Sequence, residues 1–256
     1  MINALYIAET GLNAQKSLVD VISNNIANVN TSGFKKSKID FVDLMYGPEK
    51  LDTKKNTTES NDLKGVHIAS ISQDMTAGKL KYTEHPFDVA IQGEGMIAVE
   101  YADGEIAYTR IGRLRVDNEG YLSTAQGHRL EANIGIPPDL DGVIFAPDGM
   151  VKGVINGESD LIDLGQIDLV RFNNQQGLNA VGEGLYVETE ESGTNYVGRP
   201  GDEGFGKILQ GYTEESNVSM VEEMVNLVIA QRGYQLNARV IQVSDQLLET
   251  VNNLRR

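Results

Sequence analysis

The C-terminal stretch decides the fold class. Residues 219–254 read SMVEEMVNLVIAQRGYQLNARVIQVSDQLLETVNNL, with no proline and one glycine, Gly233. Residues 219–222 fit the S-x-x-E capping box that starts helices. Apolar residues then recur at alternating steps of three and four, broken only by Arg232; they are Val225, Ile229, Leu236, Val240, Val243, Leu247, Val251 and Leu254. This spacing predicts a long amphipathic helix. A second partial stripe (Met224, Leu227, Val228, Ile241, Leu248) predicts neighbours on several sides.

The N-terminal stretch carries a similar stripe. Met1, Leu5, Ala8, Leu12, Val19, Ile22, Ile26 and Val29 follow the heptad step, with Gln15 as the one polar member. We expect a helix that ends near residues 30–33, with Gly33 as its left-handed C-terminal cap. Lys35, Lys36 and Lys38 follow, and we interpret them as compensation of the helix dipole.

Proline and glycine separate these ends from the middle of the chain. All six prolines lie between Pro48 and Pro200, and 25 of the 27 glycines lie between Gly33 and Gly211. The exceptions are Gly11 and Gly233. Turn signals at residues 102–105, 117–120 and 147–149 separate short apolar runs, which is typical of β-strands. The sequence therefore predicts a mixed α+β chain: a helix at each end and a turn-rich β region between them.

Composition excludes several classes of function. The net charge of −15 argues against affinity for nucleic acid or an anionic membrane, because both are polyanions. The absence of cysteine removes disulfides, cysteine-based zinc sites and thiol nucleophiles. No apolar run is long enough to span a membrane, so we expect no membrane insertion. The N-terminus also lacks the pattern of a cleavable signal peptide.

Motifs for catalysis, cofactors or metals receive little support. Residues 93–98 fit G-x-G-x-x-A, but a dinucleotide site needs a helix to start there. The following residues look like a strand, so we interpret the glycines as a bend between two strands. His67, His85 and His128 have no metal-ligand spacing. We expect no catalytic, cofactor-binding or metal site, and hence no enzyme.

Several stretches resemble flagellar basal-body rod proteins. They are the opening LYIAETGLNAQKSLVDVISNNIANVNTSGFKKSKIDFVDLMY, then DVAIQGEGMIAV, AYTRIGRLRVDNEGYLSTAQGH, and the closing LQGYTEESNVSMVEEMVNLVIAQRGYQLNARVIQVSDQLLETVNNL. The resemblance covers nearly the whole chain, and its most specific parts are SNNIANVNT and SNVSMVEEMVNLVIAQRGYQ. The length and residues 46–80 favour a subunit of the distal rod. The alternatives are a proximal-rod or hook-like protein of the same axial family, or a monomeric binding module.

The resemblance implies a domain organisation. Residues 1–33 and 216–256 would be the helices of an inner domain, paired as a coiled coil. Residues 34–85 would be a connecting segment with a long loop and β extension, the loop lying at 47–65. Residues 86–190 would form a β-rich outer domain, and residues 191–215 would return the chain to the last helix.

The resemblance also implies sites and partners. The expected assembly interface consists of Leu5, Leu12, Val19, Ile22, Ile26, Val29, Val225, Ile229, Leu236, Val240, Val243, Leu247 and Val251. Phe41 and Met45 match the family's export-gate motif. Expected partners are further copies of the chain in a helical polymer, other rod and hook proteins, periplasmic and outer-membrane ring proteins, and the type III export apparatus. The expected location is the basal body, from the periplasm to the outer membrane.

Overall fold

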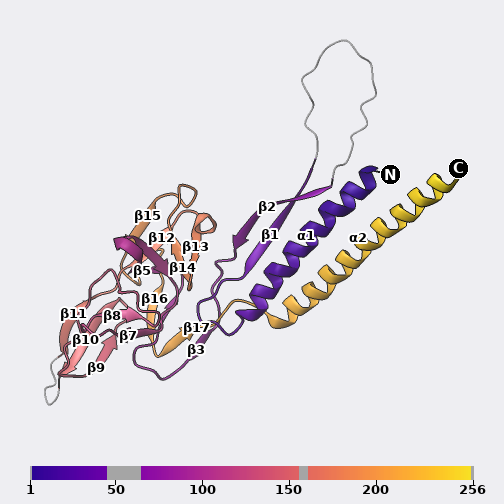
Figure 1. Cartoon of the computed structure of the whole chain (residues 1–256). Helices are drawn as coiled ribbons and strands as arrows, with labels where there is room; N and C mark the ends of the chain where they lie inside the picture. The colour runs from indigo at the N-terminus through magenta and orange to yellow at the C-terminus, as the bar shows by residue number, and fades with distance from the viewer. Residues whose placement is uncertain (1, 45–64, 156–160, 255–256) are drawn as a thin grey trace, which may run out of the picture. The chain divides into compact units, whose positions relative to one another are not determined.

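The computed structural model describes residues 2–44, 65–155 and 161–254 and divides into two compact units (Figure 1). Unit 1 comprises Met1–Ala27, Ser37–Gln73 and Ser219–Arg256. Unit 2 comprises Asn28–Lys36 and Asp74–Val218. Terminal helices with a strand-rich middle confirm the predicted mixed α+β class. The predicted loop at 47–65, apart from Gly65, lies outside the described residues.

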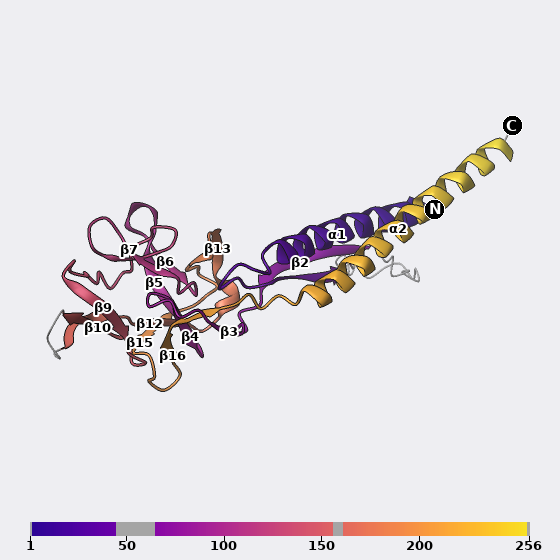
Figure 2. The same cartoon turned by 90° about the horizontal axis from the view of Figure 1, so that it is seen from below.

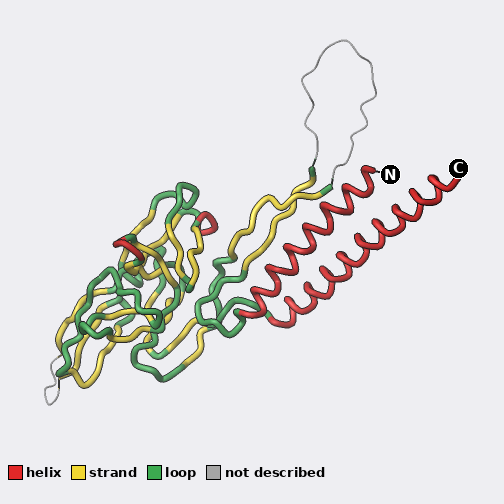
Figure 3. The backbone as a smooth tube through the Cα atoms, in the orientation of Figure 1, coloured by secondary structure: helices red, strands yellow, loops and turns green. Residues whose placement is uncertain are grey.

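Unit 1 contains both helices, α1 (Ile2–Ala27) and α2 (Met220–Leu254). They pack side by side and run antiparallel (Figures 1 and 3). Helix α2 begins directly after Ser219, as the capping pattern predicts, and the Glu223 N–H donates to the Ser219 carbonyl at 3.0 Å. Supercoiling of the pair into a coiled coil stays a prediction.

The predicted cap of α1 at Gly33 is wrong. The helix ends at Ala27, and the chain turns where the Thr31 N–H donates to the Asn28 carbonyl at 3.1 Å. Gly33 does have a left-handed φ of 72°, but six residues beyond the helix. Its role is close packing within unit 2: a Cβ there would lie 3.0 Å from Ile111 Cγ1 and 3.2 Å from the Arg110 carbonyl carbon.

A two-stranded ribbon is the other element among the described residues of unit 1. Strands β1 (Ser37–Asp43) and β2 (Val66–Gln73) pair antiparallel, with an irregularity between Asp40 and Phe41. The ribbon runs along α1 and contacts it (Figure 2). Asn25 joins the ribbon to the helix, since its amide donates to the Ser37 carbonyl at 3.0 Å and accepts from the Ser37 N–H at 2.9 Å. The Asn-rich end of α1 therefore fixes where the ribbon starts.

The described residues of unit 2 form short strands and two 3₁₀ turns. The strands are β3 (Leu80–Tyr82), β4 (Val89–Gln92), β5 (Met96–Glu100), β6 (Ile106–Thr109), β7 (Leu114–Val116), β8 (Leu122–Thr124), β9 (Leu140–Phe145), β10 (Met150–Ile155), β11 (Leu161–Gln166), β12 (Leu169–Phe172), β13 (Asn179–Gly182), β14 (Leu185–Val187), β15 (Asn195–Gly198), β16 (Lys207–Gln210) and β17 (Tyr212–Glu214). The turns are η1 (Ala102–Gly104) and η2 (Gln175–Gly177).

The sheets combine local hairpins with long-range pairs. The turn signals at 102–105, 117–120 and 147–149 join β5 to β6, β7 to β8 and β9 to β10, as predicted. The six-stranded sheet has the order β13-β14-β6-β5-β12-β15, and β9 to β11 form a separate sheet. Early strands pair with late ones: β3 with β17 and β4 with β16. Strands β11 and β12, although consecutive in the chain, lie in different sheets.

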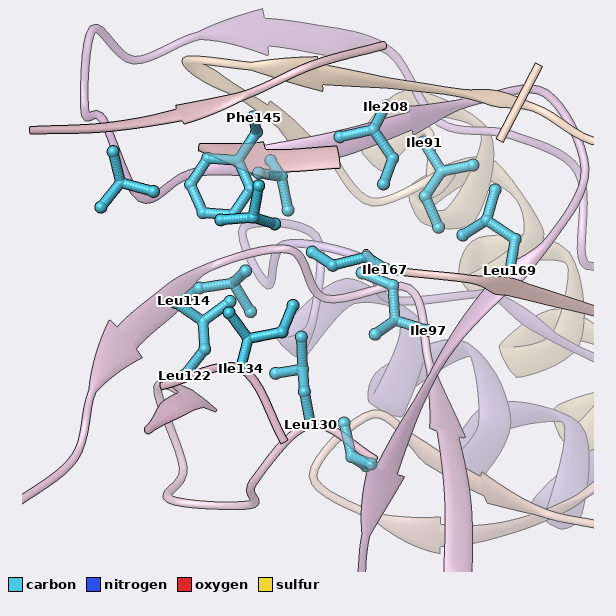
Figure 4. Packing of buried hydrophobic residues seen from close by; sticks show 14 of the residues in the cluster. Ile91, Ile97, Leu114, Leu122, Leu130, Ile134, Phe145, Ile167, Leu169 and Ile208 are labelled. Atoms are coloured by element: carbon cyan, nitrogen blue, oxygen red, sulfur yellow. The ribbon is translucent and has the colours of Figure 1, made fainter. Parts of the chain in front are cut away.

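An apolar core holds these sheets together. Its buried members come from strands and connecting segments throughout unit 2 (Figure 4); they include Ile91, Ile97, Leu114, Leu122, Leu130, Ile134, Phe145, Ile167, Leu169 and Ile208. Gly93 and Gly95 lie between β4 and β5, both with positive φ. Strand β5 follows them, so the G-x-G segment is the predicted bend between strands.

Candidate assembly surface

Helix α2 exposes most of its apolar side chains. The predicted interface positions on this helix have exposed fractions between 44% and 64%; they are Val225, Ile229, Leu236, Val240, Val243, Leu247 and Val251. Exposing so many apolar side chains in one band marks an interaction surface in a soluble protein. No helix within the described ranges is both long enough and apolar enough to cross a membrane. We call these seven residues the α2 stripe.

The face of α2 that packs within the chain is a different one. Its buried or half-buried positions are spaced three or four residues apart, except that Ala238 adjoins Asn237; they are Glu223, Leu227, Ala230, Gly233, Asn237, Ala238, Ile241 and Ser244. Most of these side chains are small or polar, and Ala230 is fully buried. Helix α2 therefore packs within the chain through these mostly small or polar residues, which we call the seam, and leaves the α2 stripe exposed.

Two glycines fix the register of the helix pair. A Cβ at Gly11 would lie 2.7 Å from Asn237 Nδ2, and a Cβ at Gly233 would lie 3.0 Å from the Gln15 side chain. Each amide thus lies over a glycine of the other helix. In this antiparallel register Ile2 lies opposite Gln246, so the last two turns of α2 extend beyond the start of α1.

The predicted interface positions on α1 are less exposed than those on α2. Ile22 is buried, and the others are half-buried; these are Leu5, Leu12, Val19 and Ile26 on the helix and Val29 beyond its end. This difference arises because α1 contacts both α2 and the ribbon. The structure therefore leaves much less apolar surface on α1 than on α2.

Some exposed apolar residues were absent from the predicted interface. They are Tyr6 and Ile7 on α1 and Met220, Val221, Met224, Val228, Tyr234 and Leu248 on α2. Met224, Val228 and Leu248 belong to the second partial stripe, which the sequence does reveal. Exposure of the other five follows from the rotation of each helix about its axis, which periodicity alone does not give.

The export-gate residues are described only in part. Phe41 lies on β1 with 41% of its side chain exposed, next to Val42 at 50%. Both are available to a partner. Met45 lies outside the described residues.

Unit 2 contains a buried charge cluster that the sequence did not reveal. Lys35, Arg110 and Glu214 have side-chain exposures of 0%, 5% and 1%. Glu214 accepts from Lys35 Nζ at 2.5 Å through Oε1 and from Arg110 Nε at 2.8 Å through Oε2. Arg110 also donates to the carbonyls of Ile91, Gly93 and Gly95. Two buried cationic side chains therefore share one carboxylate.

Burial and pairing act in opposite directions on these groups. Burial opposes ionisation of Glu214, but the charges of Arg110 and Lys35 outweigh it and hold the pKa of the carboxyl below its usual value. For Lys35, burial dominates over the attraction of Glu214 and lowers the pKa of the ammonium group. Glu214 is thus held as a carboxylate at neutral pH.

The role predicted for Lys35 is wrong. It lies eight residues beyond the end of α1, and its ammonium group donates to Glu214 and to the Thr76 carbonyl at 2.8 Å rather than to helix carbonyls. A short run of lysines in a sequence indicates surface charge, and only the fold brings Lys35 to its buried partner Glu214.

Asn217 ties together three chain segments of unit 2. It accepts from the Lys36 N–H at 2.8 Å and donates to the Asp74 carbonyl at 2.7 Å. The Asp74 N–H in turn donates to the Lys36 carbonyl at 2.9 Å. This Asn belongs to the SNVSM stretch that resembles rod proteins, so the motif has a structural purpose in addition to starting α2.

Three family descriptions match successive parts of the chain. "Flagella basal body rod protein" matches residues 5–35, which contain most of α1. "Flagellar hook protein FlgE/F/G D1 domain" matches residues 90–153 in unit 2. "Flagellar basal body rod FlgEFG protein C-terminal" matches residues 209–254, which contain α2.

Full-length relatives decide the family. The flagellar basal-body rod protein FlgG of Buchnera aphidicola subsp. Schizaphis graminum is 41% identical, covering 99% of this chain and 100% of the relative. The chain belongs to the flagellar basal-body rod protein family. FlgG of Borreliella burgdorferi is 39% identical, with complete coverage of both chains. These relatives are structural rod proteins, so this chain is a structural protein of the flagellar basal body and not an enzyme.

A related rod protein is slightly more distant. Within Caulobacter vibrioides, FlgG is 37% identical to this chain over 98% of its length, and FlgF is 34% identical over 96%. The chain is therefore most like FlgG.

Proposed function

We propose that this protein is a structural subunit of the distal rod, which assembles into a rigid helical tube and transmits torque from the motor to the hook. The α2 stripe carries the proposal, because seven apolar side chains on one helix face find no cover within the described chain. Because each side chain is about half exposed, burying the rest of it would contribute about 0.7–1.5 kcal/mol before the cost of association. Contacts with several neighbouring copies are what a torsionally stiff tube requires.

The partners proposed follow from the same assembly. Adjacent copies cover the α2 stripe, and other rod and hook proteins continue the tube at its ends. Periplasmic and outer-membrane ring proteins would surround it, and the net charge of −15 would favour repulsion from acidic surfaces. A proximal-rod role is the second candidate, favoured by the FlgF relative at 34% identity.

Export precedes assembly in this proposal. The chain leaves the cell unfolded through the flagellar type III apparatus, without a cleavable signal peptide. Phe41 and Met45 form the proposed gate motif. Among the described residues, the exposure of Phe41 supports this proposal. The core of the folded unit does not depend on this side chain, so it is available for a role in export.

The test places charge in the α2 stripe. Ile229→Lys and Val240→Lys alter exposed positions, so the isolated subunit should keep its stability to within about 0.5 kcal/mol. We expect secretion to continue while rod assembly and swimming are lost, because a lysine cannot be buried between apolar helices without a partner. Electron microscopy of isolated basal bodies and soft-agar motility measure the two outcomes.

Gln242→Lys is the matched control, since Gln242 is exposed on the same helix but lies outside the α2 stripe. It should assemble and swim as the parent does. Full-length, motile rods from both stripe variants would show that α2 does not make the contacts proposed.

A further inference from the structure

We infer that Gln15 and Asn237, each seated over a glycine of the opposite helix, select which faces of α1 and α2 pair within the chain and so leave the α2 stripe free. The inference rests on the proposed function for the use of that stripe between chains. The selection itself concerns contacts within one chain.

The first observation is reciprocal packing. Gln15 lies over Gly233, and Asn237 lies over Gly11, with contacts to a built Cβ of 3.0 and 2.7 Å. Gly11 and Gly233 are also the only glycines outside the region from Gly33 to Gly211. A glycine inside a helix reduces its stability, so each needs a reason, and room for the opposing amide supplies it.

The second observation is the chemistry of Gln15. Its Oε1 is buried without a hydrogen-bond partner among the described residues. A buried unpaired acceptor costs stability. An apolar side chain would avoid this cost, and every other position of the N-terminal stripe is apolar. A polar residue at one interior position of paired helices is a known means of fixing their register at some cost in stability.

The alternative pairing explains what the amides exclude. Adjacent residues of a helix point about 100° apart, so a turn of this size would replace Ala230 by Ile229 on the contact face. Such a pairing buries more apolar surface. It also replaces Gly233 by Arg232 opposite Gln15, so the space that this glycine leaves for the amide is filled by a long side chain. The space at Gly233 and the Gln15 amide that fits it therefore raise the free energy of the rotated pairing, which apolar burial alone would favour.

Introduced cysteine pairs report which face is used, because the natural chain has none. The register places Leu18 opposite Ala230, one heptad along from Gly11 and Asn237. Leu18→Cys with Ala230→Cys reports the observed pairing, and Leu18→Cys with Ile229→Cys reports the rotated one. Disulfide yield is measured on the dilute, full-length subunit, so that only bonds within one chain count.

Gln15→Leu combined with Asn237→Leu removes both amides. We expect the ratio of observed to rotated disulfide to fall by about tenfold, equivalent to about 1.4 kcal/mol. The matched control is Asn13→Leu combined with Gln235→Leu, two exposed amides on the same helices, which should leave the ratio unchanged.

A second variant tests the inference even if the leucine variant does not fold. Gly11→Ala combined with Gly233→Ala fills the space at both glycines while raising helix propensity, and it should shift the ratio in the same direction. An unchanged ratio in this variant and in any folded leucine variant overturns the inference. The proposed function is tested separately, because the lysine variants are assayed for rod assembly between chains, whereas the cysteine ratio is measured within single chains that carry no lysine in the α2 stripe.

Discussion

Glu214 is the residue on which the buried charge cluster of unit 2 depends. Its carboxylate accepts hydrogen bonds from both Lys35 and Arg110, and it also accepts from the Gly78 N–H at 2.7 Å. Lys35 and Glu214 are 179 positions apart in the sequence. The cluster therefore ties the beginning of unit 2 to its end. Removing its carboxylate and removing one of its cations should affect stability differently.

Removing the carboxylate should cost more than removing the ammonium group. Glu214→Gln leaves two buried cations unpaired and should reduce the free energy of unfolding by about 3–5 kcal/mol. Lys35→Met leaves the neutral Arg110–Glu214 pair and should cost clearly less. Urea titration monitored by tyrosine fluorescence measures both variants. Equal losses in the two would contradict this account.

The same carboxylate predicts a dependence on pH. Its pKa is depressed in the folded protein relative to the ordinary value of 4.5. Its stabilising contribution is therefore present above pH 4.5 and is lost as the pH falls through the folded pKa. The difference in unfolding free energy between the parent and Glu214→Gln should shrink over that acidic range. Urea titrations of both proteins at several pH values test this, and a constant difference would refute it.

At the scale of the element, the two faces of α2 should differ in how well they tolerate a larger side chain. The face toward α1 is made mostly of small or polar residues and is covered, whereas the α2 stripe is exposed. Enlarging a side chain should matter on the first face and not on the second. This contrast separates packing within the chain from packing between chains.

Ala230→Leu should destabilise the helix pair by about 1–3 kcal/mol, because this fully buried position has no room for a larger side chain. Gln242→Leu makes a similar enlargement at an exposed position and should have little effect. Thermal melts followed by circular dichroism at 222 nm report on both helices, which lie in unit 1. Equal melting temperatures in the two variants would show that the seam is not tightly packed.

At the scale of the whole molecule, the two units should differ in resistance to proteolysis. Unit 2 has an extensive core, whereas α2 of unit 1 exposes many apolar side chains. Regions with few buried contacts open most readily. Assembly would protect α2 by covering it.

Trypsin should therefore cleave the dilute subunit first at Arg232 and Arg239, which are exposed on α2, and spare the buried Lys35 and Arg110. In isolated basal bodies we expect the α2 sites to be protected. Mass spectrometry of timed digests identifies each cut. Resistance of α2 in the dilute subunit would mean that the helix already has its partners and would favour a monomeric binding module.

Local patterns in the sequence determined the elements. Heptad spacing predicted both helices, the capping pattern placed the start of α2 after Ser219, and turn signals placed three hairpins of unit 2. These features depend on neighbours a few residues apart, so one sequence suffices to predict them. The resemblance of the terminal stretches to rod proteins gave the family in the same way.

Tertiary structure decided the features that join distant residues. The pairing of β4 with β16 and the meeting of Lys35 with Glu214 depend on how the chain returns on itself, which no local spacing records. The rotation of α2 is the clearest case. Apolar periodicity identifies its most apolar face, but the space that Gly11 and Gly233 leave for the opposing amides decides that a different face packs within the chain. Steric fit between two helices is a property of both surfaces together, and neither sequence segment contains it alone.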